Sequence, residues 1–206
     1  TGSGRTTTPY HQEVEDNIIA RVVEELETSS DYRARREAIV AFNRTSPILR
    51  KGIALTPVKF GISFTMTAFN QAGALVHVYN DGSIHLNHGG TEMGQGLYTK
   101  VAQVIADTFQ VDISRVKIPA TTTGKVPNTS ATAASSGTDL NGMAALDAAR
   151  QIKERLIAFA AEKYAVPASE VEFLPNQVRV GSEIFAFRDF VKQAYFGRVQ
   201  LSAAGF

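Results

Sequence analysis

Eight residues, Gly89 to Gly96, constrain the fold of this chain more than any other stretch. They read GGTEMGQG and join a strand-like run to a helix-like run. Four glycines in eight positions cost backbone entropy, so the segment must need positive φ angles or close backbone contacts. Glycines also let N–H groups approach an anion beside the partial positive charge of a helix start. The stretch predicts either an anion or cofactor loop or a tight strand-to-helix connection.

Composition and motif spacing narrow the function classes. The motif lacks the Lys-Ser/Thr pair of a P-loop and the glycine spacing of a dinucleotide fingerprint. A net charge of +1 over 206 residues provides no concentrated basic field, so we expect neither nucleic acid nor membrane as a partner. The absence of cysteine excludes disulfides and thiolate metal sites. It fits a reducing compartment, and we expect a cytoplasmic protein.

The first 46 residues predict a loose segment over 1–12 and then a helical lead-in over 13–46. Apolar residues recur at every fourth position on one face of the first helix: Val14, Ile18, Val22 and Leu26. A second helix over 32–43 has Asp31 or Ser30 as its N-cap. Its expected inner residues are Ile39, Val40 and Phe42. Its outer arginines, Arg33, Arg35 and Arg36, indicate either a phosphate site or a solvated face.

Residues 47–206 predict an α+β arrangement of hairpins, a mixed sheet and packed helices. The expected strands are a β run over 52–65, a hairpin over 73–90 around Asn80-Asp81-Gly82, a strand over 116–119, a hairpin over 178–184 and a final strand. The expected helices cover 97–108, 139–164 and 187–195. The long helix should bury Met143, Leu146, Ile152, Leu156 and Phe159. The hydroxyl-rich segment 120–137 is either a flexible linker or an ordered polar loop.

Three of the four histidines gather near the central hairpin. His77 and His85 lie on its two arms, and His88 follows the second arm, whereas His11 carries no signal. Facing histidines can bind a metal, but cross-strand polar pairs are common. Because no carboxylate lies at ligand spacing beside them, a polar pair is favoured over a metal site.

Four blocks give the chain a family resemblance. These are LTPVKFGISFT at 55–65, NQAGALVHVYNDGS at 70–83, GGTEMGQGLYTK at 89–100 and VPNTSATAASSGTDLNG at 126–142. In order and spacing they resemble the xanthine dehydrogenase and aldehyde oxidase family of molybdenum hydroxylases, from about residue 45 to the end. The resemblance implies a partial molybdopterin-binding domain. Members hydroxylate a carbon next to a ring nitrogen, take oxygen from water, and pass electrons to [2Fe–2S] clusters and FAD on another domain or subunit.

The resemblance also implies the cofactor contacts. Met93, Gly94 and Gln95 would contact the pterin and its phosphate, with Met93 packing under the cofactor and Gln95 meeting a pterin edge. Ala133, Ala134 and Ser135 would lie against the molybdenum and the polar edge of the pterin. Ala134 would be near the metal without being a side-chain ligand. Gly137 stands where relatives often have Ser, which removes or replaces one hydroxyl contact.

On the substrate side, the resemblance assigns Phe64 and Thr65. Phe64 would meet a purine edge-on, and Thr65 would hydrogen-bond a purine oxygen. From the residues alone, Phe64 is instead a core side chain of an alternating strand. KFGISFT favours the xanthine dehydrogenase branch, which oxidises hypoxanthine and xanthine to urate, over an aldehyde oxidase or another azaheterocycle hydroxylase.

Several family motifs are missing from the sequence. The GVGEPP-type motif with the catalytic glutamate is absent, as are the FGG and FRGFGG segments, and Glu92 is not that base. We therefore expect a piece of a longer polypeptide with no catalytic residue of its own. It would need the remainder of the molybdopterin subunit, and the isolated piece would be inactive. A remaining alternative is a non-catalytic domain that acts only in folding or assembly.

Overall fold

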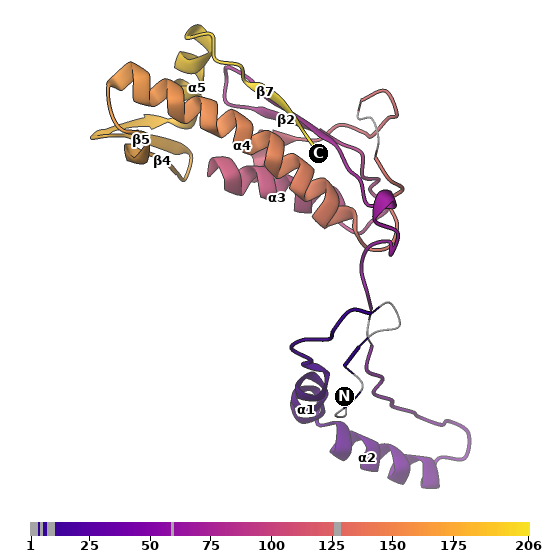
Figure 1. Cartoon of the computed structure of the whole chain (residues 1–206). Helices are drawn as coiled ribbons and strands as arrows, with labels where there is room; N and C mark the ends of the chain where they lie inside the picture. The colour runs from indigo at the N-terminus through magenta and orange to yellow at the C-terminus, as the bar shows by residue number, and fades with distance from the viewer. Residues whose placement is uncertain (1–3, 5, 8–10, 59, 126–128) are drawn as a thin grey trace. The chain divides into compact units, whose positions relative to one another are not determined.

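The computed structural model describes residues 4, 6, 7, 11–58, 60–125 and 129–206. The chain divides into two compact units, residues 1–60 and 61–206. Helices occur together with antiparallel and parallel strand pairs, so the predicted α+β class is confirmed. Figure 1 shows these elements from the indigo N-terminus to the yellow C-terminus.

The first unit contains two helices, α1 (Ile19–Ser29) and α2 (Tyr32–Thr45). The predicted start of the first helix at Val14 is wrong, because the Val14 N–H donates to the Thr6 carbonyl at 2.6 Å. Thr7 and Glu13 form an isolated β-bridge beside that contact. The expectation of a loose segment over 1–12 falls largely outside the described residues.

The apolar side chains of these two helices remain largely uncovered within this unit. Ile18, Val22 and Leu26 all belong to the exposed large apolar side chains. Val40 is exposed too, so its prediction as an inner residue is wrong, whereas Ile39 and Phe42 are half-buried. Sequence periodicity identifies an apolar face, but it does not supply the atoms that cover it.

The N-terminus of α2 differs in detail from its prediction. Asp31 occupies the N-cap position with φ of 49°, and its side chain makes no capping hydrogen bond. The Ser30 hydroxyl instead donates to the Leu26 carbonyl at 2.6 Å. Arg33 pairs with Glu27 at 3.2 Å, and Arg36 donates to the Tyr32 hydroxyl at 3.0 Å. These exposed contacts favour the solvated-face interpretation of the arginines.

The β run expected over 52–65 is wrong, since none of the described residues in that range belongs to a strand. A strand needs a neighbour that pairs with its N–H and C=O groups. The described contacts provide only one such bond, from the Ser63 N–H to the Ala134 carbonyl at 2.9 Å. Val58, Phe60 and Ile62 stay exposed accordingly.

The second unit is organised around a mixed sheet with the order β3-β2-β1-β7. The central hairpin joins β1 (Ala74–Val78) to β2 (Ile84–His88) in antiparallel pairing, as predicted. β3 (Val116–Lys117) runs parallel to β2 and is shorter than expected. β7 (Ser202–Gly205) pairs with β1 and confirms the final strand.

Two helices pack together beside this sheet, α3 (Leu97–Phe109) and α4 (Gly137–Tyr164) (Figure 1). Ile152 and Leu156 are buried as expected, whereas Met143 is exposed and its prediction is wrong. The buried face of α4 consists instead of small residues: Ala144, Ala145, Ala148 and Ala149. Small side chains let β7 approach closely, and a Cβ on Gly205 would lie 2.1 Å from the Ala144 carbonyl oxygen.

The C-terminal part adds a three-stranded antiparallel sheet. β4 (Val171–Leu174) pairs with β5 (Gln177–Val180), which pairs with β6 (Glu183–Ala186). The β5–β6 hairpin was predicted, and β4 was not. Helix α5 (Phe187–Phe196) follows and places Phe187 and Phe190 against Phe173. None of the helices in the described part of the chain is long and apolar enough to span a membrane.

Candidate functional site

The glycines of residues 89–96 serve two different purposes. Gly94 and Gly96 have φ of 94° and 77°, which side-chain-bearing residues rarely adopt. Gly89 and Gly90 provide room instead. A Cβ on Gly89 would lie 2.1 Å from the Thr129 hydroxyl oxygen, and one on Gly90 would lie 2.5 Å from Leu97 Cδ2. The first pair bends the loop, and the second lets it pack against its neighbours.

Glu92 occupies the start of α3. Its carboxylate accepts hydrogen bonds from the N–H groups of Gly94 at 2.9 Å, Gly96 at 3.0 Å and Tyr98 at 3.0 Å. These bonds, the one from Tyr98 first, lower the pKa of Glu92 below its ordinary value. The Glu92 carboxylate thus satisfies N–H groups at this helix start, and the loop remains a predicted anion or cofactor site. An acidic residue just before a helix was the available sequence signal.

Gln95 holds the shape of the same loop. Its Nε2 donates to the Thr91 carbonyl at 2.9 Å, and its Oε1 accepts from the Met93 N–H at 2.6 Å. An amide carries two donor hydrogens and two acceptor lone pairs, so each end retains capacity for one more bond. Met93 is 66% exposed, with its side chain free of the core.

The second loop, which precedes α4, contains two residues with left-handed backbone. Ala134 and Ser135 have φ of 54° and 52°. Such a conformation costs a residue with a Cβ roughly 1–2 kcal/mol, so the surrounding contacts must hold it in place. Ser136 contributes by donating its hydroxyl to the Ala133 carbonyl at 3.0 Å, and the Ala134 carbonyl accepts from Ser63.

Hydrogen bonds tie this second loop to the rest of the unit. The Thr91 N–H donates to the Thr132 hydroxyl at 2.9 Å, which joins the two loops directly. Ser130 exchanges two bonds with the Gln71 backbone, at 2.9 and 3.1 Å. These contacts favour the ordered-loop interpretation of 120–137 over a flexible linker, for the part outside residues 126–128, which the structure does not describe.

Both loops line one hollow of about 440 Å³. Six of the seven residues that the resemblance selects as cofactor contacts lie around it: Met93, Gln95, Ala133, Ala134, Ser135 and Gly137. Gly94 is not among its lining residues. Two distant stretches of sequence thus meet at one concave surface made largely of small side chains and backbone.

Lys100 is a lining residue that the sequence did not single out. It lies on the first turn of α3, where it adds a cation to a hollow with otherwise uncharged walls. Its position one helical turn after Gly96 was the only signal, and charged residues on exposed helix turns are too common to be selective.

Phe64 and Thr65 are not among the lining residues of this hollow, although the preceding Ser63 donates to the carbonyl of Ala134, which is one of them. Asn70 fixes Phe64 with two bonds, accepting from its N–H at 2.9 Å and donating to its carbonyl at 2.7 Å. The Phe64 ring packs edge-on against Phe69, with ring centroids 6.1 Å apart. The interpretation of Phe64 as a core residue in an alternating strand is therefore wrong, because Phe64 is only half-buried and belongs to no strand.

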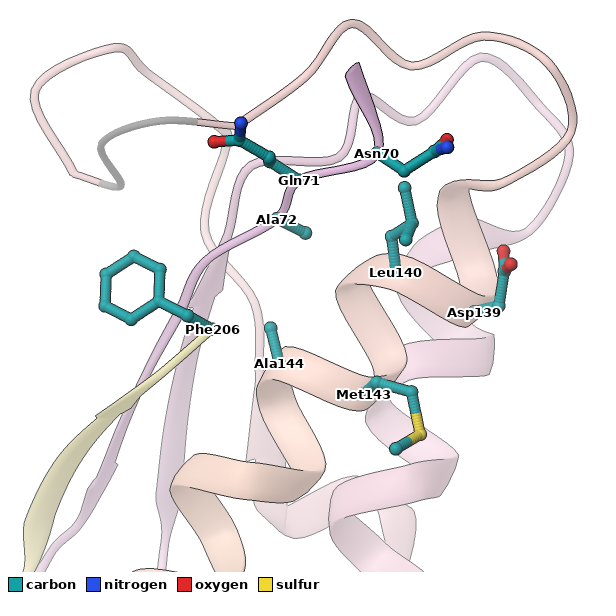
Figure 2. A pocket seen from close by; sticks show the side chains of 8 residues that line it. All are labelled: Asn70, Gln71, Ala72, Asp139, Leu140, Met143, Ala144 and Phe206. Atoms are coloured by element: carbon teal, nitrogen blue, oxygen red, sulfur yellow. The ribbon is translucent and has the colours of Figure 1, made fainter. Parts of the chain in front are cut away.

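A second hollow, of about 360 Å³, holds none of the predicted site residues. Figure 2 shows Leu140 and Ala144 of α4 on one side, with Ala72 and Phe206 on the other. Its walls are mainly apolar, and its polar groups are the side chains of Asn70, Gln71 and Asp139. No described nucleophile or histidine faces it, so it offers packing surface rather than chemistry.

The histidines take separate positions. His77 and His85 face each other across the β1–β2 ladder, with ring centroids 6.2 Å apart, and His77 Nδ1 lies 2.7 Å from the Ser202 hydroxyl. Burial first, and His85 second, lower the pKa of His77. No group of three or more His, Cys, Asp or Glu that could hold a metal occurs in residues 11–58, 60–125 and 129–206. The arrangement is that of a cross-strand polar pair.

His88 is buried beside the first loop and binds its backbone. It is 2% exposed, its Nδ1 accepts from the Gly90 N–H at 3.1 Å, and Tyr98 packs edge-on against its ring. Burial lowers the pKa of His88 to about 4. The ring is therefore neutral at pH 7, with Nε2 carrying the proton because Nδ1 accepts a bond.

The chain is similar in sequence to several known proteins. The chain is 45% identical over 199 residues to a xanthine dehydrogenase of Dictyostelium discoideum and 44% identical over 204 residues to one of Blastobotrys adeninivorans. The alignments cover 97% and 98% of this chain but only 13% of each relative. The chain thus spans a small part of the curated relatives it matches.

A solved structure and a family description extend the comparison. Quinoline 2-oxidoreductase from Pseudomonas putida 86 superposes with a TM-score of 0.78 over 97% of this chain and 27% of that one, at 19% identity, which indicates a shared fold. Residues 25–206 match the family described as a molybdopterin cofactor-binding domain. The chain belongs to the molybdopterin cofactor-binding domain family.

Proposed function

We propose that the hollow between the two loops binds the molybdopterin cofactor. The observation that carries the proposal is the meeting of Met93, Gln95 and the 133–137 loop on one concave surface. The family match supports the same cofactor. When bound, the cofactor supplies a redox-active molybdenum, and the residues of this chain bind it, orient it and exclude water.

The lining residues suit a flat heterocycle with a charged tail. Small side chains at Ala133, Ala134 and Ser135 leave backbone groups accessible to the ligand. Gln95 has one donor and one acceptor site to spare, which matches the alternating polar edge of a pterin. The Lys100 ammonium supplies positive charge for a phosphate, a role that the Glu92-occupied helix start does not take.

The whole protein that contains this chain is proposed to be a xanthine dehydrogenase. It would hydroxylate hypoxanthine and xanthine with oxygen from water and pass electrons to [2Fe–2S] clusters and FAD on another domain or subunit. Two relatives with that printed name, at 45% and 44% identity, support this. In the proposal, Phe64 and Thr65 contact the purine, and the catalytic acid–base residues belong to other parts of the protein. The proposed location is the cytoplasm.

A direct test measures molybdenum by elemental analysis and pterin by fluorescence after oxidation, on the purified whole protein that contains this chain. The proposal expects both to be retained in equal amounts. In Lys100→Gln, loss of a charge-assisted bond to phosphate weakens retention by about tenfold or more. Lys117→Gln, an exposed lysine on β3 away from the hollow, is the matched control. Equal retention in both variants would remove Lys100 from the binding surface.

The substrate is tested separately in the whole protein. A xanthine dehydrogenase oxidises hypoxanthine much faster than aldehydes, whereas an aldehyde oxidase shows the reverse preference. Phe64→Ala should raise KM for the purine, because the variant loses an edge-on ring contact worth about 1 kcal/mol. The isolated chain should oxidise no purine. Hypoxanthine oxidation by the pure chain would contradict the assignment of the acid–base residues to other segments.

A further inference from the structure

We propose that Asn141 is a positioning residue that fixes the spacing between the two loops of the hollow. It lies on the first turns of α4, behind the lining residues rather than among them. The inference rests on the proposed function only in naming the ligand. The contact between the loops is a property of this chain by itself.

The first contact lies within α4, at the helix residue where the second loop ends. Asn141 Nδ2 donates to the Gly137 carbonyl at 2.8 Å. Gly137 lines the hollow and begins α4, with only Ser136 between it and the left-handed pair Ala134 and Ser135. The Asn141 amide therefore fixes the carbonyl of Gly137, the first helical residue after the strained part of the loop.

The second contact is with the first loop. A Cβ on Gly90 would lie 2.9 Å from Asn141 Nδ2 and 3.2 Å from Asn141 Cγ. The side-chain amide is thus pressed against the Gly90 backbone, at a position where only glycine leaves room. Leu97, which lines the hollow, fills the remaining side, 2.5 Å from the same Cβ position.

The burial of the Asn141 side chain indicates that this residue does more than stabilise the fold. Asn141 is 4% exposed, and its Oδ1 has no hydrogen-bond partner among the described residues. A buried acceptor without a partner is costly, and a leucine of similar size would avoid that cost. Asn141 is therefore a poor choice for stability alone. The Asn141 side chain provides one hydrogen-bond donor, which binds the Gly137 carbonyl while the amide packs against Gly90.

Asn141→Leu should have opposite effects on global stability and on the order of the two loops. The variant should unfold at the same temperature as the wild type or higher, because the unpaired acceptor is gone. Both loops should nevertheless loosen, and amide hydrogen exchange at Thr91, Gly94, Gly96 and Ser136 should accelerate at least tenfold. Thr108→Val is the matched control: it removes a buried hydroxyl that donates to Val104 at 2.7 Å, far along α3 from the loops.

A second variant, in the first loop, disturbs the same contact between Gly90 and Asn141. Gly90→Ala places its Cβ against the amide and should displace Nδ2 from Gly137, with the same acceleration in both loops. If Asn141→Leu fails to fold, this variant carries the test. Unchanged exchange in the loops overturns the proposal. A uniform acceleration, as large in β1 and β2 as in the loops, overturns it too, because it reports global destabilisation.

Cofactor retention is measured on the same variants in the whole protein. Asn141→Leu should retain at least tenfold less molybdopterin than Thr108→Val at equal melting temperature. A wild-type protein that holds no pterin would overturn the proposed function, yet the exchange result would still decide the role of Asn141. Loosened loops with full pterin content would overturn the positioning role.

Discussion

The Glu92 carboxylate lies 3.0 Å from the backbone nitrogen of Tyr98, across the turn that begins α3. The same carboxylate accepts from Gly96, the N-cap of α3, and from Gly94 in the preceding loop, so one side chain satisfies the N–H groups of the helix start and of the loop. Glu92→Gln removes the charge and one acceptor oxygen. We expect a lower melting temperature at pH 7 and faster amide exchange at these three residues.

The pH dependence follows from the lowered pKa of Glu92. A carboxyl whose folded-state pKa is depressed stabilises the fold above its unfolded pKa, and this stabilisation is lost as pH falls through the folded value. The difference in melting temperature between wild type and Glu92→Gln should therefore be constant above the ordinary value of 4.5 and shrink below it. A difference that stays constant down to the acid unfolding limit would contradict this.

The sequence predicted well the pairing of strands that are neighbours along the chain. It predicted poorly which elements from distant parts of the chain pack against each other. The hairpin register follows from alternation around Asn80-Asp81-Gly82, which needs only neighbouring residues. The β run over 52–65 alternates similarly, but a strand also needs a partner, which its own residues do not encode. Met143 fits a helical repeat, yet alanines face the sheet, because closeness to β7 selects small residues.

The candidate site shows the same division. Motif resemblance selected residues on both loops, and six of them surround one hollow. The roles of Glu92, Lys100 and Asn141 depend on distances between segments, which spacing alone does not give. Glu92 in particular is of a residue type common among catalytic and metal-binding side chains, but its carboxylate accepts hydrogen bonds from nearby backbone N–H groups.

Backbone strain in the second loop gives a further prediction. Ala134 has φ of 54°, where glycine lacks the Cβ penalty, so Ala134→Gly should raise the free energy of unfolding by up to about 1 kcal/mol. Ala133 is not among the positive-φ residues. Ala133→Gly is therefore the matched control and should lower that free energy by roughly 0.5–1 kcal/mol. Urea unfolding of both variants measures the sign, and the same sign in both would contradict the strain.

Close packing of the last strand on α4 can be tested at Gly205. A Cβ there would lie 2.1 Å from the Ala144 carbonyl oxygen and 2.7 Å from the Ala148 nitrogen, and both are backbone atoms. Gly205→Ala should lower the free energy of unfolding by about 1–3 kcal/mol, because strand and helix must separate. Gly124→Ala has no atom within 4 Å of its Cβ and serves as the control. Equal stabilities of the two variants would show that β7 does not pack as described.

His88 provides the clearest titration. Its folded pKa of about 4 lies below the ordinary value of 6.5, so the unfolded chain takes up a proton before the folded one does. Stability linked to His88 is complete above pH 6.5 and is lost as pH falls toward 4, by up to about 3 kcal/mol. His88→Gln keeps an acceptor for the Gly90 N–H and cannot titrate. The free-energy difference between wild type and this variant should shrink over that range in urea unfolding. Imidazole NMR shifts of His88 should remain those of a neutral ring at pH 5.5, and a protonated ring at that pH would contradict its burial.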